Sequence, residues 1–336
     1  MALLTKEETL HFIRDVMEVP IRELPHITDP SLSAKFKVDF LSTILKAHLG
    51  RQPFQSITLM SWEVKDRHRP SWEEIKSNML LRRGGVCYWH NTFMYGLLAS
   101  LGFDVTMSHS TVAGGFDRDN HLVVLVHDLV SKGSLHVVDV GMGFYIPRPI
   151  PLDFDDESAV FKDSILTYKL KKESPNKIIV LQATKKETPS SGDNAQNSAE
   201  ELEWNNFYEF DPTERFRNLD EFFPCFNIFF SDVTKLPFHT SARAVCFPNG
   251  KLIGIVNTKL LEEKEEGKLT KSLILKDLSV DSNNPGTQSG QNGLQPLINA
   301  YAKHFPQFPL DVLLPALNNF RGYILQKEGP RHVDYN

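Results

Sequence analysis

The sequence lacks any hydrophobic run that would anchor the chain in a membrane or direct its secretion. No stretch approaches the ~18 consecutive apolar residues of a membrane span, and acidic residues among the first ten positions argue against a signal peptide. Cysteine is also scarce. Cys87, Cys225 and Cys246 are widely separated, so no pair has the close spacing of zinc ligands. We therefore expect a cytoplasmic protein without a membrane partner, in which Cys87 is a free thiol.

An excess of basic residues is missing as well. The 37 lysines and arginines are outnumbered by 42 aspartates and glutamates, the formal net charge is −5, and the basic residues are scattered. Nucleic acid is therefore not an expected partner. The chain does have length: 336 residues, of which 41% are hydrophobic, are sufficient for two or three layers or domains around a sizeable core.

The most informative stretch is a pair of glycines that precedes a predicted helix. Gly84 and Gly85 allow a sharp bend directly before Val86 and Cys87, and apolar residues then recur at helical spacing as far as Gly102. Cys87 falls in the first turn of this helix, where unpaired N–H groups and the helix dipole favour a thiolate. A buried cysteine that merely fills space is the alternative, so the interpretation depends on its partners.

Two apolar, β-branched runs supply those partners. Residues 121–126 and 135–140 are joined by a polar, glycine-containing connection, which predicts an antiparallel hairpin. Pairing His121 with Asp139 centres the hairpin at residue 130, within the connection, and places both side chains on one face. A thiol, an imidazole and a carboxylate together form the arrangement that nucleophilic acyl transfer requires.

The remaining pattern changes from helical to strand-like near residue 104. Thr5 and Glu8 form a capping box for a first helix. Further helices are predicted at 32–49, from Pro70 onward, at 295–304 and at 310–318. Strands are predicted at 105–112, 178–181, 204–210, 226–231, 244–247 and 252–256.

This order predicts three parts. Residues 1–103 form a helical domain that ends in the Cys87 helix, and residues 104–210 form a mostly antiparallel sheet or open barrel. Residues 211–336 contain both strands and helices. The polar segments 185–201 and 279–293 lack large apolar residues, and we expect them to be flexible insertions.

Several motifs, taken in order, resemble the arylamine N-acetyltransferase family. They are Arg-Gly-Gly-Val-Cys at 83–87, His-Leu-Val-Val-Leu-Val at 121–126 and Val-Asp-Val-Gly-Met-Gly-Phe at 138–144, with weaker matches at 52–56, 227–231 and 237–238. Gln55 and Ser56 replace the family's usual Glu-Asn, Val86 replaces an aromatic residue, and Met142 replaces a common phenylalanine. These departures concern the substrate pocket and leave the reacting groups in place.

The resemblance implies an α+β fold. Its parts would be an N-terminal helical domain, an antiparallel β-barrel domain and a C-terminal α/β lid around a cysteine-protease-like Cys-His-Asp core. It also implies an acyltransferase of xenobiotic metabolism, in which Cys87 carries the acyl group, His121 moves protons and Asp139 orients His121. The acyl donor would be acetyl-CoA or, as in some fungal relatives, malonyl-CoA, with no bound cofactor. Arylamines, arylhydrazines or arylhydroxylamines would be the acceptors.

The same resemblance implies binding residues. Those expected at the acyl-CoA are Asp117, Arg118, Phe229 and Lys235, and those expected at the acceptor are Asn120, His121 and Met142. Core packing is the alternative for Phe229, and solvated charge is the alternative for Arg118 and Lys235. For a malonyl donor, Arg118 is our candidate cation for the additional carboxylate.

Other functions remain open from sequence alone. His90 and the hairpin histidines suggest a metal site, but no second cysteine or clustered ligand set accompanies them, so we predict none. A papain- or transglutaminase-like cysteine hydrolase would use the same three residue types. A non-catalytic CoA-binding module would keep them as a relic. The sequence does not indicate the oligomeric state.

Overall fold

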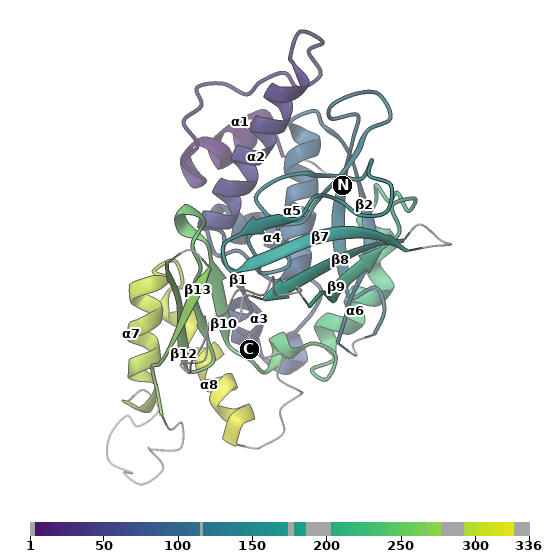
Figure 1. Cartoon of the computed structure of the whole chain (residues 1–336). Coiled ribbons are helices and arrows are strands. Elements are labelled where there is room, and N and C mark those ends of the chain that lie inside the picture. Colours follow the sequence, from purple (N-terminus) through teal and green to yellow (C-terminus); the bar gives the residue numbers. More distant parts are fainter. Residues whose placement is uncertain are drawn as a thin grey trace.

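The computed structural model describes residues 4–114, 117–173, 178–185, 203–265, 267–276 and 292–325. Its helices and two antiparallel sheets are arranged as Figure 1 shows: α1 and α2 at the top, an eight-stranded sheet on the right, and a five-stranded sheet with α7 at the lower left. The predicted flexible insertions lie almost wholly outside the described residues, at 186–201 and 279–291.

The N-terminal helices begin where the sequence supplies capping side chains. The Thr5 hydroxyl accepts the Glu8 N–H and the Glu8 carboxylate accepts the Thr5 N–H, and Ser71 and Glu74 repeat this exchange at α4. The predicted helices are confirmed. The elements are α1 (Lys6–His11), the π-helical η1 (Phe12–Val16), α2 (Ala34–Arg51), α3 (Ile57–Ser61), η2 (Val64–Asp66), α4 (Trp72–Leu80) and α5 (Cys87–Ser100).

Helix α5 lies at the centre of the N-terminal region. Its residues from Cys87 to Leu98 are all buried, so this part of the helix presents no face to solvent. The Phe93 ring packs against Phe12 with centroids 4.6 Å apart. Leu122 and Val124 of the neighbouring sheet belong to the same core cluster as α5, so the helix is enclosed by helices and by one face of the sheet.

The larger sheet has the strand order β5-β4-β3-β2-β9-β8-β7-β6, and all its pairs are antiparallel. Its strands are β2 (Asp104–Val112), β3 (His121–His127), β4 (Leu135–Val138), β5 (Ile150–Pro151), β6 (Phe161–Asp163), β7 (Leu166–Glu173), β8 (Ile178–Lys185) and β9 (Asn205–Phe210). The sheet is curled. Val137 of β4 and Leu170 of β7, which are far apart in strand order, belong to one core cluster on its inner face. Within the described residues β5 and β6 do not pair, so the predicted barrel is an open sheet. Its edge strands β5 and β6 have only two and three residues.

The predicted β3–β4 hairpin forms, but its register differs by two residues. Val124 lies opposite Val138, so the hairpin is centred at residue 131 rather than 130. A turn closed by the Asp128 N–H and the Ser134 carbonyl, 2.9 Å apart, sets this centre. A shift of two preserves the side-chain faces, so Asp139 remains on the face of His121 as its diagonal neighbour.

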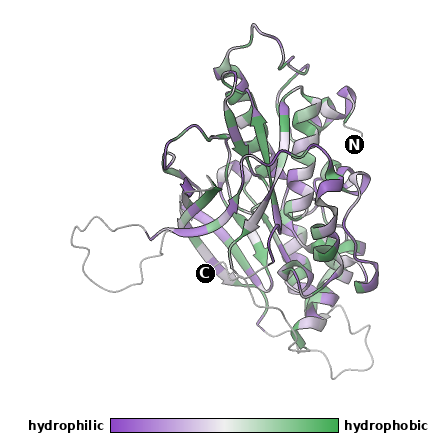
Figure 2. Ribbon diagram, turned by 90° about the vertical axis from the view of Figure 1, so that its right-hand side faces the viewer, coloured by the Kyte–Doolittle hydropathy of each residue, from purple (hydrophilic) through white to green (hydrophobic). Residues whose placement is uncertain are grey.

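The smaller sheet has the order β1-β10-β11-β12-β13 and is covered by helices. Its strands are β1 (Phe54–Gln55), β10 (Arg243–Cys246), β11 (Ile253–Val256), β12 (Lys259–Glu265) and β13 (Lys268–Leu273). Ala244 and Ile255 share a core cluster with Ile57 of α3, Tyr301 of α7 (Gln295–His304) and Leu317 of α8 (Leu310–Leu325). The predicted strands at 244–247 and 252–256 and both C-terminal helices are confirmed. Figure 2 shows helices gathered along one side of the strands.

One predicted strand is wrong. Residues 226–231 belong to helix α6 (Phe223–Ser231), which follows the 3₁₀-helix η3 (Leu219–Phe222). The run is rich in phenylalanine, which favours strands. However, Phe226 and Phe230 are spaced one helical turn apart and both pack on Tyr88 of α5, with centroid distances of 4.8 and 5.7 Å. Tertiary packing therefore decides the conformation.

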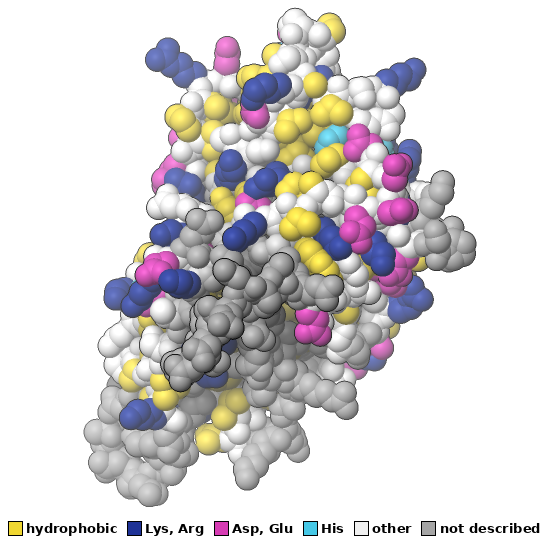
Figure 3. Space-filling view, viewed as in Figure 1, with side chains coloured by type: hydrophobic (Ala, Val, Ile, Leu, Met, Phe, Trp, Pro, Cys, Tyr) yellow, Lys and Arg dark blue, Asp and Glu magenta, His cyan; other side chains and the backbone are white. Residues whose placement is uncertain are grey.

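Two segments join regions that are remote from them in the chain. Helix α6 packs on the N-terminal helices, while β1 is an edge strand of the C-terminal sheet. The boundaries at residues 103 and 210 remain predictions. Within the described residues no helix combines the length and apolar character needed to span a membrane. Figure 3 shows acidic and basic side chains on the same face of the molecule.

Candidate active site

The glycine pair before Cys87 is docked against another segment of backbone. Gly84 has a φ of +65°, and a β-carbon on it would lie 2.0 Å from the carbonyl oxygen of Pro53. The Gly85 N–H donates to that same oxygen at 3.2 Å, and the Gln55 N–H donates to the Gly85 carbonyl at 2.8 Å. The turn therefore requires glycine at position 84 for both conformation and space, and it fixes where α5 begins.

Cys87 is the first residue of α5 and is 6% exposed. Its sulfur lies 3.9 Å from the main-chain oxygen of Asn120, to which the thiol can donate. The preceding residue, Val86, offers no side-chain cap. Cys87 therefore lies at the end of α5 where the main-chain N–H groups have no carbonyl partner within the helix.

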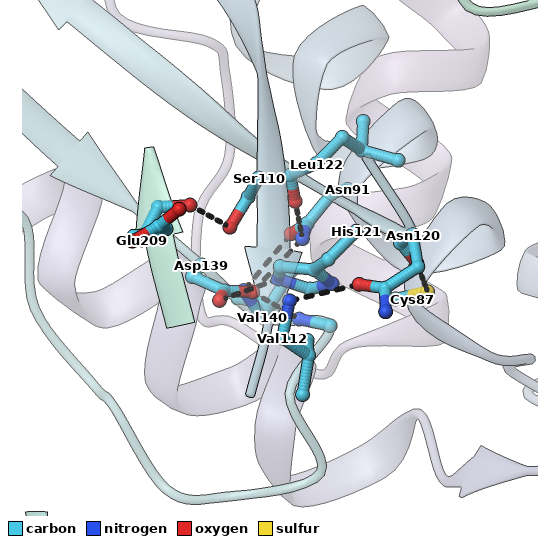
Figure 4. A network of polar contacts seen from close by, with 11 residues as sticks. Cys87, Asn91, Ser110, Val112, Asn120, His121, Leu122, Asp139, Val140 and Glu209 are labelled. Atoms are coloured by element: carbon cyan, nitrogen blue, oxygen red, sulfur yellow. Dashed lines mark hydrogen bonds and ion pairs between the residues drawn. The ribbon is translucent and has the colours of Figure 1, made fainter. Parts of the chain in front are cut away.

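His121 and Asp139 form a buried pair beside Cys87 (Figure 4). The His121 Nε2 lies 2.9 Å from Asp139 Oδ2, and both side chains are 1% exposed. Burial alone would lower the pKa of His121, but the Asp139 carboxylate and a hydrogen bond with the Cys87 side chain outweigh it. Together they raise the pKa to about 10. With Nε2 bonded to Asp139, Nδ1 is the ring nitrogen left for the sulfur.

Asp139 is held as a carboxylate by donors on several sides. Burial alone would raise its pKa, but the charge of His121 and hydrogen bonds from His121, Asn91 and Gly141 lower it. The Gly141 N–H and the Asn91 Nδ2 each donate to Oδ1 at 2.8 Å. The pair therefore carries opposite charges although both groups are buried.

Asn91 was not predicted from the sequence, yet it connects the three segments of the site. Asn91 lies one helical turn after Cys87. Its Nδ2 donates to the Leu122 carbonyl at 2.7 Å and also to Asp139, and its Oδ1 accepts the Val140 N–H at 3.0 Å. Its side chain is fully buried. An asparagine in a mostly apolar helix, four residues from the cysteine and therefore on its face, was the available signal.

Tyr208 of β9 was also missed. Its hydroxyl bonds to Asp139, its ring lies 5.4 Å from that of His121, and burial raises the pKa of its hydroxyl. No local pattern marks this residue, because it reaches the site only through the order of strands in the sheet. On the opposite side Gly141 lies so close to α5 that a β-carbon would be 2.9 Å from Cys87 Cα.

Of the residues predicted at the acceptor, His121 belongs to this group and Asn120 lies beside it. Asn120 is 4% exposed, and its Oδ1 accepts the Val112 N–H at 2.8 Å while its main-chain oxygen faces Cys87. Its side chain therefore fastens the loop before β3 to the end of β2. Met142 is partly buried and packs against the inner cluster of the curled sheet.

The residues predicted at the acyl-CoA divide into two groups. Asp117 and Lys235 form an ion pair of 2.7 Å that joins the loop before β3 to the segment after α6, and the Arg118 side chain is 78% exposed, 3.4 Å from Glu209. Phe229 is 3% exposed within the core cluster around α5, which agrees with the core-packing alternative. In the part of the chain that the structure describes, no group of three or more potential ligands could hold a metal ion.

Comparison with known proteins identifies the family. The sequence profile of an N-acetyltransferase family matches residues 37–282, which is more than half of the chain. The chain belongs to the arylamine N-acetyltransferase family. This confirms the resemblance drawn from the motifs around Cys87, His121 and Asp139.

Individual arylamine N-acetyltransferases are distant relatives. The arylamine N-acetyltransferase of Mycobacterium bovis is 29% identical over 133 residues, 38% of this chain and 44% of that protein. An uncharacterized acetyltransferase of Bacillus subtilis, YvcN, is 28% identical over 142 residues, 41% and 53% of the two chains. The chain therefore spans about half the length of these curated relatives.

The fold match is more extensive. The structure of Mycobacterium marinum arylamine N-acetyltransferase in complex with CoA superposes with a TM-score of 0.66 at 20% identity, covering 93% of this chain and 99% of that one. The helical region, the curled sheet and the C-terminal sheet with its helices therefore form the arylamine N-acetyltransferase fold.

Proposed function

We propose that the chain transfers the acyl group of an acyl-CoA to an arylamine through a thioester on Cys87. One observation carries the proposal: a thiol at the start of α5, an imidazole and a buried carboxylate meet in one hydrogen-bonded group. Membership of the arylamine N-acetyltransferase family supports the same reaction. Three free cysteines agree with a cytoplasmic setting.

In the first half-reaction the Cys87 thiolate attacks the thioester carbonyl. A new carbon–sulfur bond forms, the bond to the CoA sulfur breaks, and the departing thiolate takes the proton of the His121 imidazolium. The raised pKa of His121 keeps that proton available at neutral pH. Asp139, bonded to Nε2, directs the Nδ1 side of the ring toward the reacting sulfur.

In the second half-reaction an amine attacks the acyl-cysteine. The nitrogen forms the new amide bond and loses a proton to His121, and Cys87 departs as a thiolate, which restores the initial ion pair. The two substrates thus react in turn through one covalent intermediate. Arylamines, arylhydrazines and arylhydroxylamines each offer such a nitrogen.

The donor is a CoA thioester, in line with the CoA complex described for the Mycobacterium marinum enzyme. We place its charged part near Asp117, Arg118 and Lys235, which the structure gathers at one end of β3. The exposed guanidinium of Arg118 is our candidate partner for the additional carboxylate of a malonyl group.

Steady-state transfer to one aniline acceptor tests both parts. With the wild type, each of acetyl-, propionyl- and malonyl-CoA should release one CoA for every N-acylaniline formed. With Cys87→Ala, neither product should form. Cys225→Ser is the matched control and should remain active. Arg118→Ala should lower malonyl transfer more than acetyl transfer. CoA release without N-acylaniline would instead indicate a hydrolase, and no release from any donor would contradict acyl transfer.

A further inference from the structure

A second pair of histidines lies behind the Cys87 turn, outside the reacting group described above. His90 of α5 and His48 of α2 are 1% and 0% exposed, and the Nε2 of His48 lies 2.8 Å from the Nδ1 of His90. The Nε2 of His90 lies 3.1 Å from the carbonyl oxygen of Pro53. No catalytic step proposed above uses either ring.

The direction of this hydrogen-bond chain follows from its chemistry. A carbonyl oxygen can only accept, so the Nε2 of His90 carries a hydrogen. Burial lowers the pKa of His90 to about 4 and also lowers that of His48, so both rings are neutral. The Nδ1 of His90 is therefore an acceptor, and the Nε2 of His48 donates to it.

The far end of the hydrogen-bond chain is the Nδ1 of His48. Among the described residues nothing bonds to the Nδ1 of His48, which is buried. Aromatic rings enclose the pair: Phe12 lies 6.5 Å from the His48 ring and Phe54 stacks on His90 at 6.2 Å. Within the described residues neither ring is bonded to a carboxylate, so the pair holds no ionised partner and its contribution is geometric.

The near end of the hydrogen-bond chain is the Pro53 carbonyl oxygen, which also bonds to the glycine turn before Cys87. The Pro53 carbonyl accepts the Gly85 N–H at 3.2 Å in addition to the His90 ring. Any movement of this oxygen displaces Gly85, and Cys87 begins its helix two residues later. His90 and Cys87 are also one turn apart on α5. The helix, through His90, and the glycine turn, through Gly85, therefore bond to the same carbonyl oxygen of Pro53.

We propose that His90 and His48 are positioning residues for Cys87. His48 fixes the ring of His90, His90 fixes the Pro53 carbonyl, and this carbonyl fixes the turn that sets the location of the sulfur. The inference rests on the proposed role of Cys87 as the nucleophile. A displacement of a reacting group by about 1 Å lowers rates by one to two orders of magnitude.

Alkylation of Cys87 by iodoacetamide tests this without any acyl-CoA, so it can succeed or fail independently of acyl transfer. His48→Leu removes the donor to His90, whereas His48→Gln retains one, because the carboxamide nitrogen of glutamine lies close to the position of Nε2. We expect Cys87 to react about tenfold more slowly in His48→Leu and within about threefold of wild type in His48→Gln, although both variants lose thermal stability.

Hydrogen exchange in the peptide that contains Gly85 provides the second measurement. Exchange should be faster in His48→Leu and near wild type in His48→Gln. His136→Leu is the matched control, since His136 is 5% exposed with an unbonded Nδ1 in the described structure but lies on β4; its melting temperature should fall while Cys87 reacts normally.

Two results would overturn the proposal. One is wild-type reactivity of Cys87 in folded His48→Leu, and the other is equal slowing in His48→Leu and His48→Gln. If His48→Leu does not fold, His48→Asn takes its place, because its carboxamide is one methylene too short to reach His90 and the same loss is expected.

Discussion

Two buried histidines, one in α5 and one bonded to Cys87 at its start, carry different charges. His121 and His90 are each 1% exposed, yet the pKa of His121 is raised to about 10 and that of His90 is lowered to about 4. His121 bonds to the Asp139 carboxylate, whereas His90 bonds to a neutral imidazole and a carbonyl. Burial disfavours the cation at both positions, and only at His121 does a bonded anion overcome it.

The two histidines therefore have different proposed roles, although both are buried. In the proposed mechanism His121 supplies the proton and Cys87 the thiolate. In our further proposal His48 and His90 fix the location of Cys87. Asn91 and Gly141 connect α5 with the segment that carries Asp139. Asn91 bonds to Asp139, and Gly141 lies close to the backbone of Cys87. Variants that change one histidine's surroundings toward those of the other should therefore have distinct effects.

The largest effect is expected from Asp139→Asn, which replaces the carboxylate bonded to His121 by a neutral amide. We expect kcat/KM for acyl transfer to fall on the order of 10³- to 10⁴-fold, as when the carboxylate of a serine protease triad becomes an amide. Asp163→Asn is the control. Its carboxylate accepts from Tyr168 and Arg148 away from Cys87, so stability should fall while activity is retained. Equal activity of Asp139→Asn and wild type would contradict the assignment.

A smaller effect is expected from Gly141→Ala. The new β-carbon would lie 2.7 Å from Asn91 Nδ2 and 2.9 Å from Cys87 Cα, so either the Asp139 side or α5 must shift. Activity should fall about 10- to 100-fold, with a lower melting temperature. Gly322→Ala, whose β-carbon would meet no atom within 4 Å, should keep full activity and gain up to ~1 kcal/mol of stability. A Gly141→Ala enzyme with wild-type kinetics would show that this contact does not position the site.

The smallest effect is expected in the pH dependence of stability, to which the two histidines should contribute with opposite sign. For His90, whose pKa in the fold is about 4 against 6.5 unfolded, stability is present above pH 6.5 and is lost as pH falls toward 4. For His121, stability is present below pH 6.5 and is lost as pH rises toward 10.

Urea unfolding across these pH ranges measures the two contributions. His90→Gln should make the acid slope of the unfolding free energy shallower by about 1.4 kcal/mol per pH unit, the value of one proton. His121→Gln should instead remove a slope of opposite sign between pH 6.5 and 10. Changes of the same sign in both variants would mean that the two histidines do not differ as described.

The sequence was sufficient to predict the parts of the site that are local. Helix α5 with Cys87 in its first turn follows from a glycine pair and apolar spacing, and His121 and Asp139 follow from a hairpin pattern. The register error of two residues did not change which side chains share a face, because the side-chain period of a strand is two. Membership of the family was also predicted, since the motifs occur in the expected order.

The rest depends on contacts between distant segments. Phe226 and Phe230 form a helix because Tyr88 lies opposite them, and no local propensity contains that information. Tyr208 reaches Asp139 only because β9 pairs with β2. The link from His48 to His90 likewise joins residues 42 positions apart. Sequence periodicity specifies which face of an element is buried, but not which element covers it.

The most direct test of the central claim is the mass of the peptide that contains Cys87 after exposure to an acyl-CoA with no acceptor present. If Cys87 is the nucleophile, one acyl group should be found on Cys87 and none on Cys225 or Cys246. The acyl group should be lost when an aniline is added and N-acylaniline appears. An unmodified Cys87 peptide alongside turnover, or an acyl group that aniline does not remove, would contradict this role of Cys87.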